Sequence, residues 1–77
     1  MENNWVKTSD RQPREEYRKF KEKYPDDNFE VIVQIRDAVL STALIYDYDE
    51  ENDEDIWRDE TYNNYSVSHW MLLPVVP

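Results

Sequence analysis

The 77-residue chain contains no cysteine, no glycine and only one histidine. The lack of cysteine excludes a disulfide framework, a thiolate metal site and a cysteine nucleophile. No apolar run approaches the roughly 18 residues that a membrane span requires. The chain also lacks the basic start followed by an apolar stretch that is typical of a signal peptide. These absences predict a soluble, cytoplasmic protein with no membrane partner.

The lack of glycine restricts how the chain can turn. Left-handed backbone positions must be filled by Asn or Asp, the residues that tolerate positive φ best after glycine. We therefore expect turns at 26–28, 36–37, 52–53 and 63–64, where these residues gather.

Positive charge is scarce in the second half of the chain. Residues 1–36 hold eight basic and eight acidic side chains, whereas residues 37–77 hold ten acidic ones and Arg58 alone. The formal net charge of −9 therefore arises entirely from the second half. A surface of this sign repels phosphate backbones and attracts basic partners, which disfavours direct nucleic-acid binding.

The apolar periodicity predicts one helix followed by strands. Tyr17, Phe20 and Tyr24 recur at helical spacing, and Pro25 ends the helix. From Phe29 onward the period is two, which is typical of strands. We expect a single α+β domain, an antiparallel sheet of three to four strands with one packed helix. The expected helix is 13–24, and the expected strands are 29–36, 39–48, 56–58 and 65–73.

A chain of this length can bury only a small core, since about 60–65% of its surface leaves water on folding. Aromatic side chains compensate because each buries about 150–250 Å². We expect the core to form around Trp5, Trp57, Trp70 and Met71, with Trp5 and Trp70 clasping the two ends of the chain together.

The segment DYDEENDEDIWRDE, residues 47–60, carries nine carboxylates. One interpretation is an acidic surface that imitates a phosphate backbone and docks in a basic groove of a partner. The other is a solvated hairpin whose charges keep an aromatic-rich protein in solution and blunt a strand edge. The candidate binding residues are Asp47, Asp49, Glu50, Glu51, Asp53, Glu54, Asp55, Asp59 and Glu60.

The same segment matches a calcium-binding loop only in part. Read from Asp49, it offers alternating carboxylates and Glu60 at the twelfth position. Glu54 stands where such a loop needs glycine, and strand patterns rather than helices flank it. We expect no metal site and no cofactor.

His69 is the only histidine, the residue type whose unperturbed pKa lies near neutrality. With no second histidine, no cysteine and no serine-histidine-acid spacing, it belongs to no metal-ligand or catalytic set. Strand alternation groups it with Val67 and Met71 and places Trp70 on the opposite face. We expect a structural histidine and no catalytic residues.

The helix offers an alternative, ligand-binding site. Its residues Arg14, Arg18 and Lys21, together with Tyr17, are of the types that contact phosphate groups and stack on bases. The glutamates between them favour instead a solvated helix surface that is paired with itself.

Two stretches resemble a known family. Trp5 with Ser9–Pro13 (SDRQP) is similar to the pattern W-x-x-x-x-x-R-x-P, and Val67–Pro74 (VSHWMLLP) is similar to V-T-H-W-M-P-L-P. Both patterns belong to the domain of unknown function 551 family, small proteins of bacteriophages and bacteria. Ser68 and Leu72 depart from the second pattern.

The family has no assigned activity, so the resemblance implies a provenance rather than a mechanism. Relative to it, the helical segment 14–23 looks like an insertion. The resemblance implies an accessory protein of a phage or mobile element, in the cytoplasm of a bacterial or phage-infected cell. Such proteins often bind a host or defence component, an argument by association.

These features predict a non-enzymatic acidic interaction protein, an inhibitor that docks on a basic surface of a host or defence protein. The alternative is a protein that binds or sequesters a small ligand, such as a nucleotide, through the helix residues. A metal-dependent hydrolase that uses His69 and the acidic cluster is the least favoured interpretation. Pairing along an exposed sheet edge leaves a homodimer open.

Overall fold

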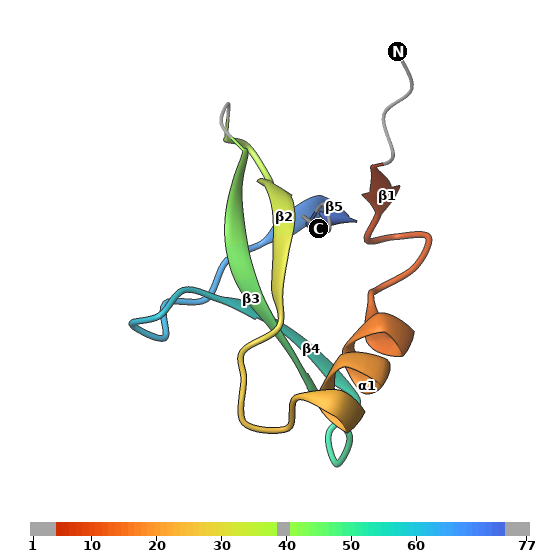
Figure 1. The fold of residues 1–77 in the computed structure, drawn as a ribbon. Coiled ribbons are helices and arrows are strands. Elements are labelled where there is room, and N and C mark those ends of the chain that lie inside the picture. Colours follow the sequence, from red (N-terminus) through yellow and green to blue (C-terminus); the bar gives the residue numbers. More distant parts are fainter. Residues whose placement is uncertain (1–4, 39–40, 74–77) are drawn as a thin grey trace.

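In the part of the chain that the structure describes, one helix and five strands form an α+β fold with a single antiparallel sheet (Figure 1). The computed structural model describes residues 5–38 and 41–73. The strands are ordered β1-β5-β2-β3-β4 across the sheet, so the first and last strands of the chain are neighbours. The elements are β1 (Val6–Lys7), α1 (Arg14–Lys23), β2 (Glu30–Ile35), β3 (Ser41–Asp49), β4 (Glu54–Arg58) and β5 (Val67–Leu72).

The α+β class is confirmed, but the sheet has five strands rather than three to four. The additional strand is β1, in which Val6 pairs with Trp70 and Lys7 with His69. Two residues are too few to show the period-two alternation by which a strand is recognised in a sequence. Residues 39 and 40, the first two of the second expected strand, lie outside the described part of the chain.

Helix α1 is shaped by its charges and its aromatic stripe. Acidic residues occupy its first turn and basic residues its last turn, which complements the helix dipole. Tyr17 and Phe20 face the sheet: the Tyr17 ring centroid lies 5.5 Å from that of Tyr46, and the Phe20 centroid lies 5.1 Å from that of Phe29. Tyr24, the third residue of the predicted stripe, is exposed.

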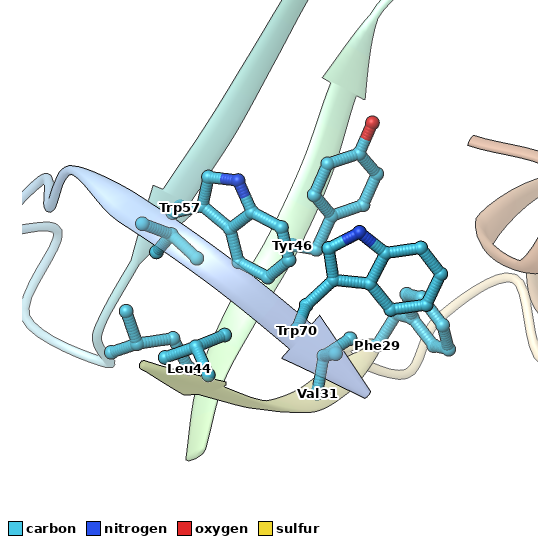
Figure 2. Close-up of a cluster of buried hydrophobic side chains, with 8 residues drawn as sticks. Phe29, Val31, Leu44, Tyr46, Trp57 and Trp70 are labelled. Carbon is cyan, nitrogen blue, oxygen red and sulfur yellow. The ribbon is translucent and has the colours of Figure 1, made fainter. Parts of the chain in front are cut away.

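The hydrophobic core lies on the face of the sheet that α1 contacts (Figure 2). Trp57 and Trp70 belong to it, whereas Trp5 and Met71 are half-buried and outside the core cluster. Met71 pairs with Ile32, whose side chain lies on the opposite face of the sheet. The buried cluster consists of Phe29, Val31, Val33, Leu44, Tyr46, Trp57, Val67 and Trp70.

Trp70 joins the two ends of the described chain. Its side chain is buried, and its Nε1 donates a hydrogen bond to the carbonyl oxygen of Arg11 at 2.8 Å. The Arg11 guanidinium lies 5.0 Å from the indole centroid. The strand partner of Trp70 is Val6. The expected clasp is therefore made through Val6 and Arg11, and no ring pair between Trp5 and Trp70 is found among the described residues.

An irregularity in β5 moves Val67 into the core. Simple alternation groups Val67 with His69 on one face. In the structure Gln34 lies opposite His69, but the next residue of β2 lies opposite Val67. Ser68 is thus the extra residue of a bulge, which reverses the alternation. Val67 is buried as a result, and the grouping expected from the sequence is wrong at this residue.

Among the described residues three adopt a positive φ, and none is a glycine because the chain has none. Asp37 (64°) and Asp53 (50°) lie in two of the expected turns. The third is Tyr62 (67°) rather than one of the asparagines that follow it. A bulky side chain rarely adopts this conformation, so the surrounding loop must impose it.

The loop after β4 returns along the outer edge of that strand. Asn64 forms a bridge to Arg58, and the backbone N–H of Tyr65 donates to the carbonyl oxygen of Trp57 at 2.9 Å. At the other edge of the sheet, β1 contributes two residues. Both edges of the sheet are therefore short or covered in part.

Candidate functional site

The acidic segment 47–60 does not form one surface. It includes the end of β3, the hairpin tip at 50–53, the whole of β4 and the start of the following loop. Strand β4 separates the tip from Asp59 and Glu60, and the tip and the loop point in different directions in Figure 1. The nine carboxylates therefore do not line up in a continuous row.

The aspartates and glutamates of this segment have different roles. Every aspartate accepts a hydrogen bond from within the protein, whereas every glutamate is exposed. The bonded carboxylates are Asp47, Asp49, Asp53, Asp55 and Asp59. The glutamates Glu50, Glu51, Glu54 and Glu60 are exposed, and so is the bonded Asp53. The exposed acidic surface is accordingly smaller than the sequence suggests.

Arg14 fixes the acidic hairpin to the helix. Its Nε and Nη2 donate to the two oxygens of Asp55 at 2.9 and 2.7 Å, a bidentate pair between α1 and β4. Its Nη1 lies 3.3 Å from Asp53, and its guanidinium lies 4.6 Å from the ring centroid of Tyr48. The hydroxyl of buried Tyr46 also donates to Asp55.

These contacts shift the titration of all three partners. Burial opposes the ionisation of Asp55, but the hydrogen bonds from Arg14 and Tyr46 outweigh it and hold the pKa of the carboxyl below its usual range. The hydrogen bond to Asp55 raises the pKa of Arg14. Burial, together with the bond to Asp55, raises the pKa of Tyr46 well above its ordinary value. The cluster therefore keeps its charged and neutral forms fixed across physiological pH.

Asp59 organises the loop after β4. Its carboxylate accepts hydrogen bonds from the backbone N–H groups of Thr61 and Asn63, each at 2.9 Å, and from the hydroxyl of Tyr65 at 2.8 Å. Because the residues on both sides of Tyr62 are held, its backbone is left in the left-handed region. The Tyr62 ring centroid lies 4.5 Å from the guanidinium carbon of Arg58.

The Asp59 carboxyl is expected to titrate well below an ordinary aspartate. The backbone N–H of Asn63, followed by the side chains of Asn63, Tyr65 and Thr61, lowers its pKa. A carbon-detected NMR titration should show a midpoint far below the value of about 3.9 expected for the same carboxyl in the urea-unfolded chain. Equal midpoints in the folded and unfolded chains would contradict the bonded geometry.

The residues of the alternative ligand site gather around one pocket. A hollow of about 250 Å³ lies between α1 and the end of β3, and Arg14, Tyr17, Arg18 and Lys21 all line it. Sequence reasoning missed three further lining residues. They are Glu22, Tyr48 and Glu50. Tyr48 could have been found, because strand alternation places it on the same face as the core residue Tyr46.

His69 does not lie next to this pocket or the acidic hairpin, because β2 separates its strand, β5, from β3 and β4. It sits on β5, and its Nδ1 lies 2.9 Å from the hydroxyl of Ser68. No group of three or more histidine, cysteine or acidic side chains in the described ranges is placed to hold a metal ion. The hydrolase hypothesis, which needs carboxylates converging on His69, finds no such cluster in this part of the chain.

The calcium-loop register is also not assembled. Asp55 is turned toward Arg14, and Asp49 accepts a bond from the side chain of Asn52 at 2.8 Å. Glu60, the expected twelfth ligand, lies beyond the far end of β4. The carboxylates thus face different partners rather than a common centre.

Comparison with models of known families, with curated proteins and with solved structures finds no match. The resemblance to the domain of unknown function 551 family therefore stays a prediction. Within the described residues, no helix has the length and apolarity needed to span a membrane.

Proposed function

We propose that this protein is a non-enzymatic interaction protein whose β3–β4 hairpin docks on a basic surface of another protein. The observation that carries the proposal is that the aspartates and the glutamates of the acidic segment have different roles. The aspartates hold the hairpin in place, while Glu50, Glu51 and Glu54 remain exposed around its tip. A fixed cluster of exposed like charges suits electrostatic steering toward a cationic partner.

The hairpin is fixed from two sides, which lowers the entropic cost of binding. Asp49 caps the turn by accepting from the backbone N–H of Glu51 at 3.1 Å, and Asp53 takes the left-handed φ that the turn needs. The bidentate bond from Arg14 to Asp55 ties β4 to the helix. A preorganised tip loses less conformational freedom on docking than a flexible acidic tail would.

The finer part of the proposal concerns the partner. An acidic protein of a phage or mobile element would act as an inhibitor by occupying a basic, nucleic-acid-binding surface of a host or defence protein. The split of the acidic segment limits this imitation to the hairpin tip. The protein itself is proposed to bind no nucleic acid directly.

Charge reversal at the tip should abolish capture of such a partner. The full chain is used as bait in a lysate of the cells that carry the gene, and Glu51→Lys/Glu54→Lys is compared with Asp26→Lys/Asp27→Lys. Both double variants change the net charge equally, but the control pair lies in the exposed loop between α1 and β2. We expect a partner that binds the native chain and the control, is lost with the tip variant, and dissociates between about 0.05 and 0.5 M salt.

Two results would contradict the proposal. One is a partner that binds both double variants equally, which would place the interface elsewhere. The other is the absence of any protein whose capture distinguishes the two variants. Circular dichroism of each variant confirms that the comparison is made between folded chains.

A further inference from the structure

The pocket between α1 and β3 combines two tyrosine rings with the cations Arg18 and Lys21, and two glutamates also line it. Tyr17 from α1 and Tyr48 from β3 provide its two rings. Among the described residues, neither Arg18 nor Lys21 forms an ion pair with an acidic side chain. Arg14, the third cation, is already bound to Asp55.

Arg18 and Lys21 place two positive charges at the pocket. Arg18 is exposed at the rim of the pocket. The Nζ of Lys21 donates to the carbonyl oxygen of Asp27 at 2.6 Å and lies 5.8 Å from the Tyr17 ring centroid. Both can therefore hold an anionic group beside the tyrosines, since Arg and Lys form charge-assisted bonds with phosphate oxygens.

We infer that this pocket binds a small ligand with one planar ring and one anionic group, of the class of a nucleoside monophosphate. The ring lies against Tyr17 or Tyr48, because aromatic side chains stack on bases of any sequence. The phosphate lies toward Arg18 and Lys21. The rim carboxylates of Glu22 and Glu50 are acceptors of the type that bind ribose hydroxyls.

The size of the pocket limits the ligand. A hollow of about 250 Å³ is smaller than the roughly 300–1,000 Å³ of pockets that bury drug-sized ligands. A mononucleotide can be held in part, whereas a dinucleotide would extend into solvent. This inference shares Glu50 with the hairpin proposal, because that residue lines the pocket and lies at the hairpin tip. Glu51 and Glu54, the residues changed in the hairpin test, do not line the pocket, so the two proposals can fail separately.

The test is an NMR titration of the folded chain with the four 5′-monophosphates AMP, GMP, CMP and UMP. We expect at least one to bind with a dissociation constant of about 1 mM or lower, and to shift amide signals of α1 and the end of β3. The matching nucleoside and inorganic phosphate, each lacking one half of the ligand, should bind at least about tenfold more weakly.

Two single variants of α1 distinguish binding in this pocket from a general electrostatic attraction between the helix and an anion. Arg18→Ala should weaken binding by about tenfold, whereas Lys19→Ala removes the same charge from a side chain that does not line the pocket. Both positions are exposed, so both variants should fold. The inference is overturned if no monophosphate binds, if inorganic phosphate binds equally well, or if the two variants behave alike.

Discussion

Replacing Trp70 with alanine should remove about 3–5 kcal/mol of unfolding free energy, the usual cost of truncating a buried aromatic side chain. Domains have about 0.05–0.15 kcal/mol of stability per residue, or about 4–12 kcal/mol for 77 residues, so this loss removes a large part of the stability. Trp70 is only 1% exposed. We therefore expect the variant to unfold at a much lower urea concentration than the native chain, or to be unfolded without urea.

The effect is large because Trp70 stabilises three parts of the fold together. It pairs with Val33 of β2 and with Val6 of β1, and its indole N–H donates to the backbone of Arg11 before the helix. Trp70→Phe keeps much of the ring but leaves the Arg11 carbonyl without this donor. It should cost less, about 1–3 kcal/mol.

Urea unfolding followed by far-ultraviolet circular dichroism measures both losses. Leu72→Ala is the matched control, because Leu72 lies on the same strand but is 48% exposed. Truncation there should cost no more than about 0.5 kcal/mol. If Trp70→Ala unfolds at the same urea concentration as Leu72→Ala, the central place of β5 in the core is wrong.

The second large effect is expected at Asp55. Replacing it with alanine leaves the hydroxyl of Tyr46, a residue with 0% exposure, without its acceptor and should cost about 1–3 kcal/mol. Adding Tyr46→Phe removes the unpaired donor as well. The double variant should then recover part of the stability, because apolar replacement of both partners is nearly neutral.

A double-mutant cycle on these two residues measures their coupling. Asp53→Asn is the control, since the Asp53 side chain is 73% exposed and asparagine also tolerates the left-handed φ of this position. It should change the unfolding free energy by no more than about 0.5 kcal/mol. Strictly additive losses in the cycle would show that the bond between Tyr46 and Asp55 contributes nothing.

The contribution of Asp55 should also depend on pH. Its pKa is lower in the folded chain than in the unfolded one, so the ionised carboxyl stabilises the fold at neutral pH. This stabilisation is fully present above the unfolded pKa of about 4 and decreases as the pH falls through the folded value. The gap in stability between the native chain and Asp55→Ala should therefore be narrower at pH 3 than at pH 7.

Most of the helix and strand positions could be predicted, because they follow from the spacing of apolar residues along the chain. The helical stripe of Tyr17 and Phe20 and the alternation from Phe29 onward place α1 and β2 close to where they are found. The strand β1 could not be predicted, because two residues carry no period and its existence depends on a partner at Trp70. The bulge at Ser68 was equally hidden, since nothing in its own side chain requires an extra residue.

The site was predicted in composition but not in arrangement. The acidic residues of 47–60 and the basic residues of the helix were recognised as candidates. The hydrogen bond between Arg14 and Asp55 joins residues 41 positions apart. Only the tertiary fold therefore reveals that each of these two side chains binds the other. One kind of contact could be predicted from the sequence. Aspartates in turns tend to accept hydrogen bonds from nearby backbone N–H groups, as Asp49 and Asp59 do here.

The return of the loop along β4 limits how a further strand could add to this edge of the sheet. An open strand edge is a template on which further chains can add, and proteins protect such edges with charge or cover. Here Asn64 and Tyr65 occupy one end of the β4 edge, and Glu54 and Asp55 place carboxylates at the other. A second copy joining there would have to break existing hydrogen bonds and bring like charges together. Of the residues that the hairpin offers to a partner, Glu54 thus also protects this edge of the sheet against the addition of further strands.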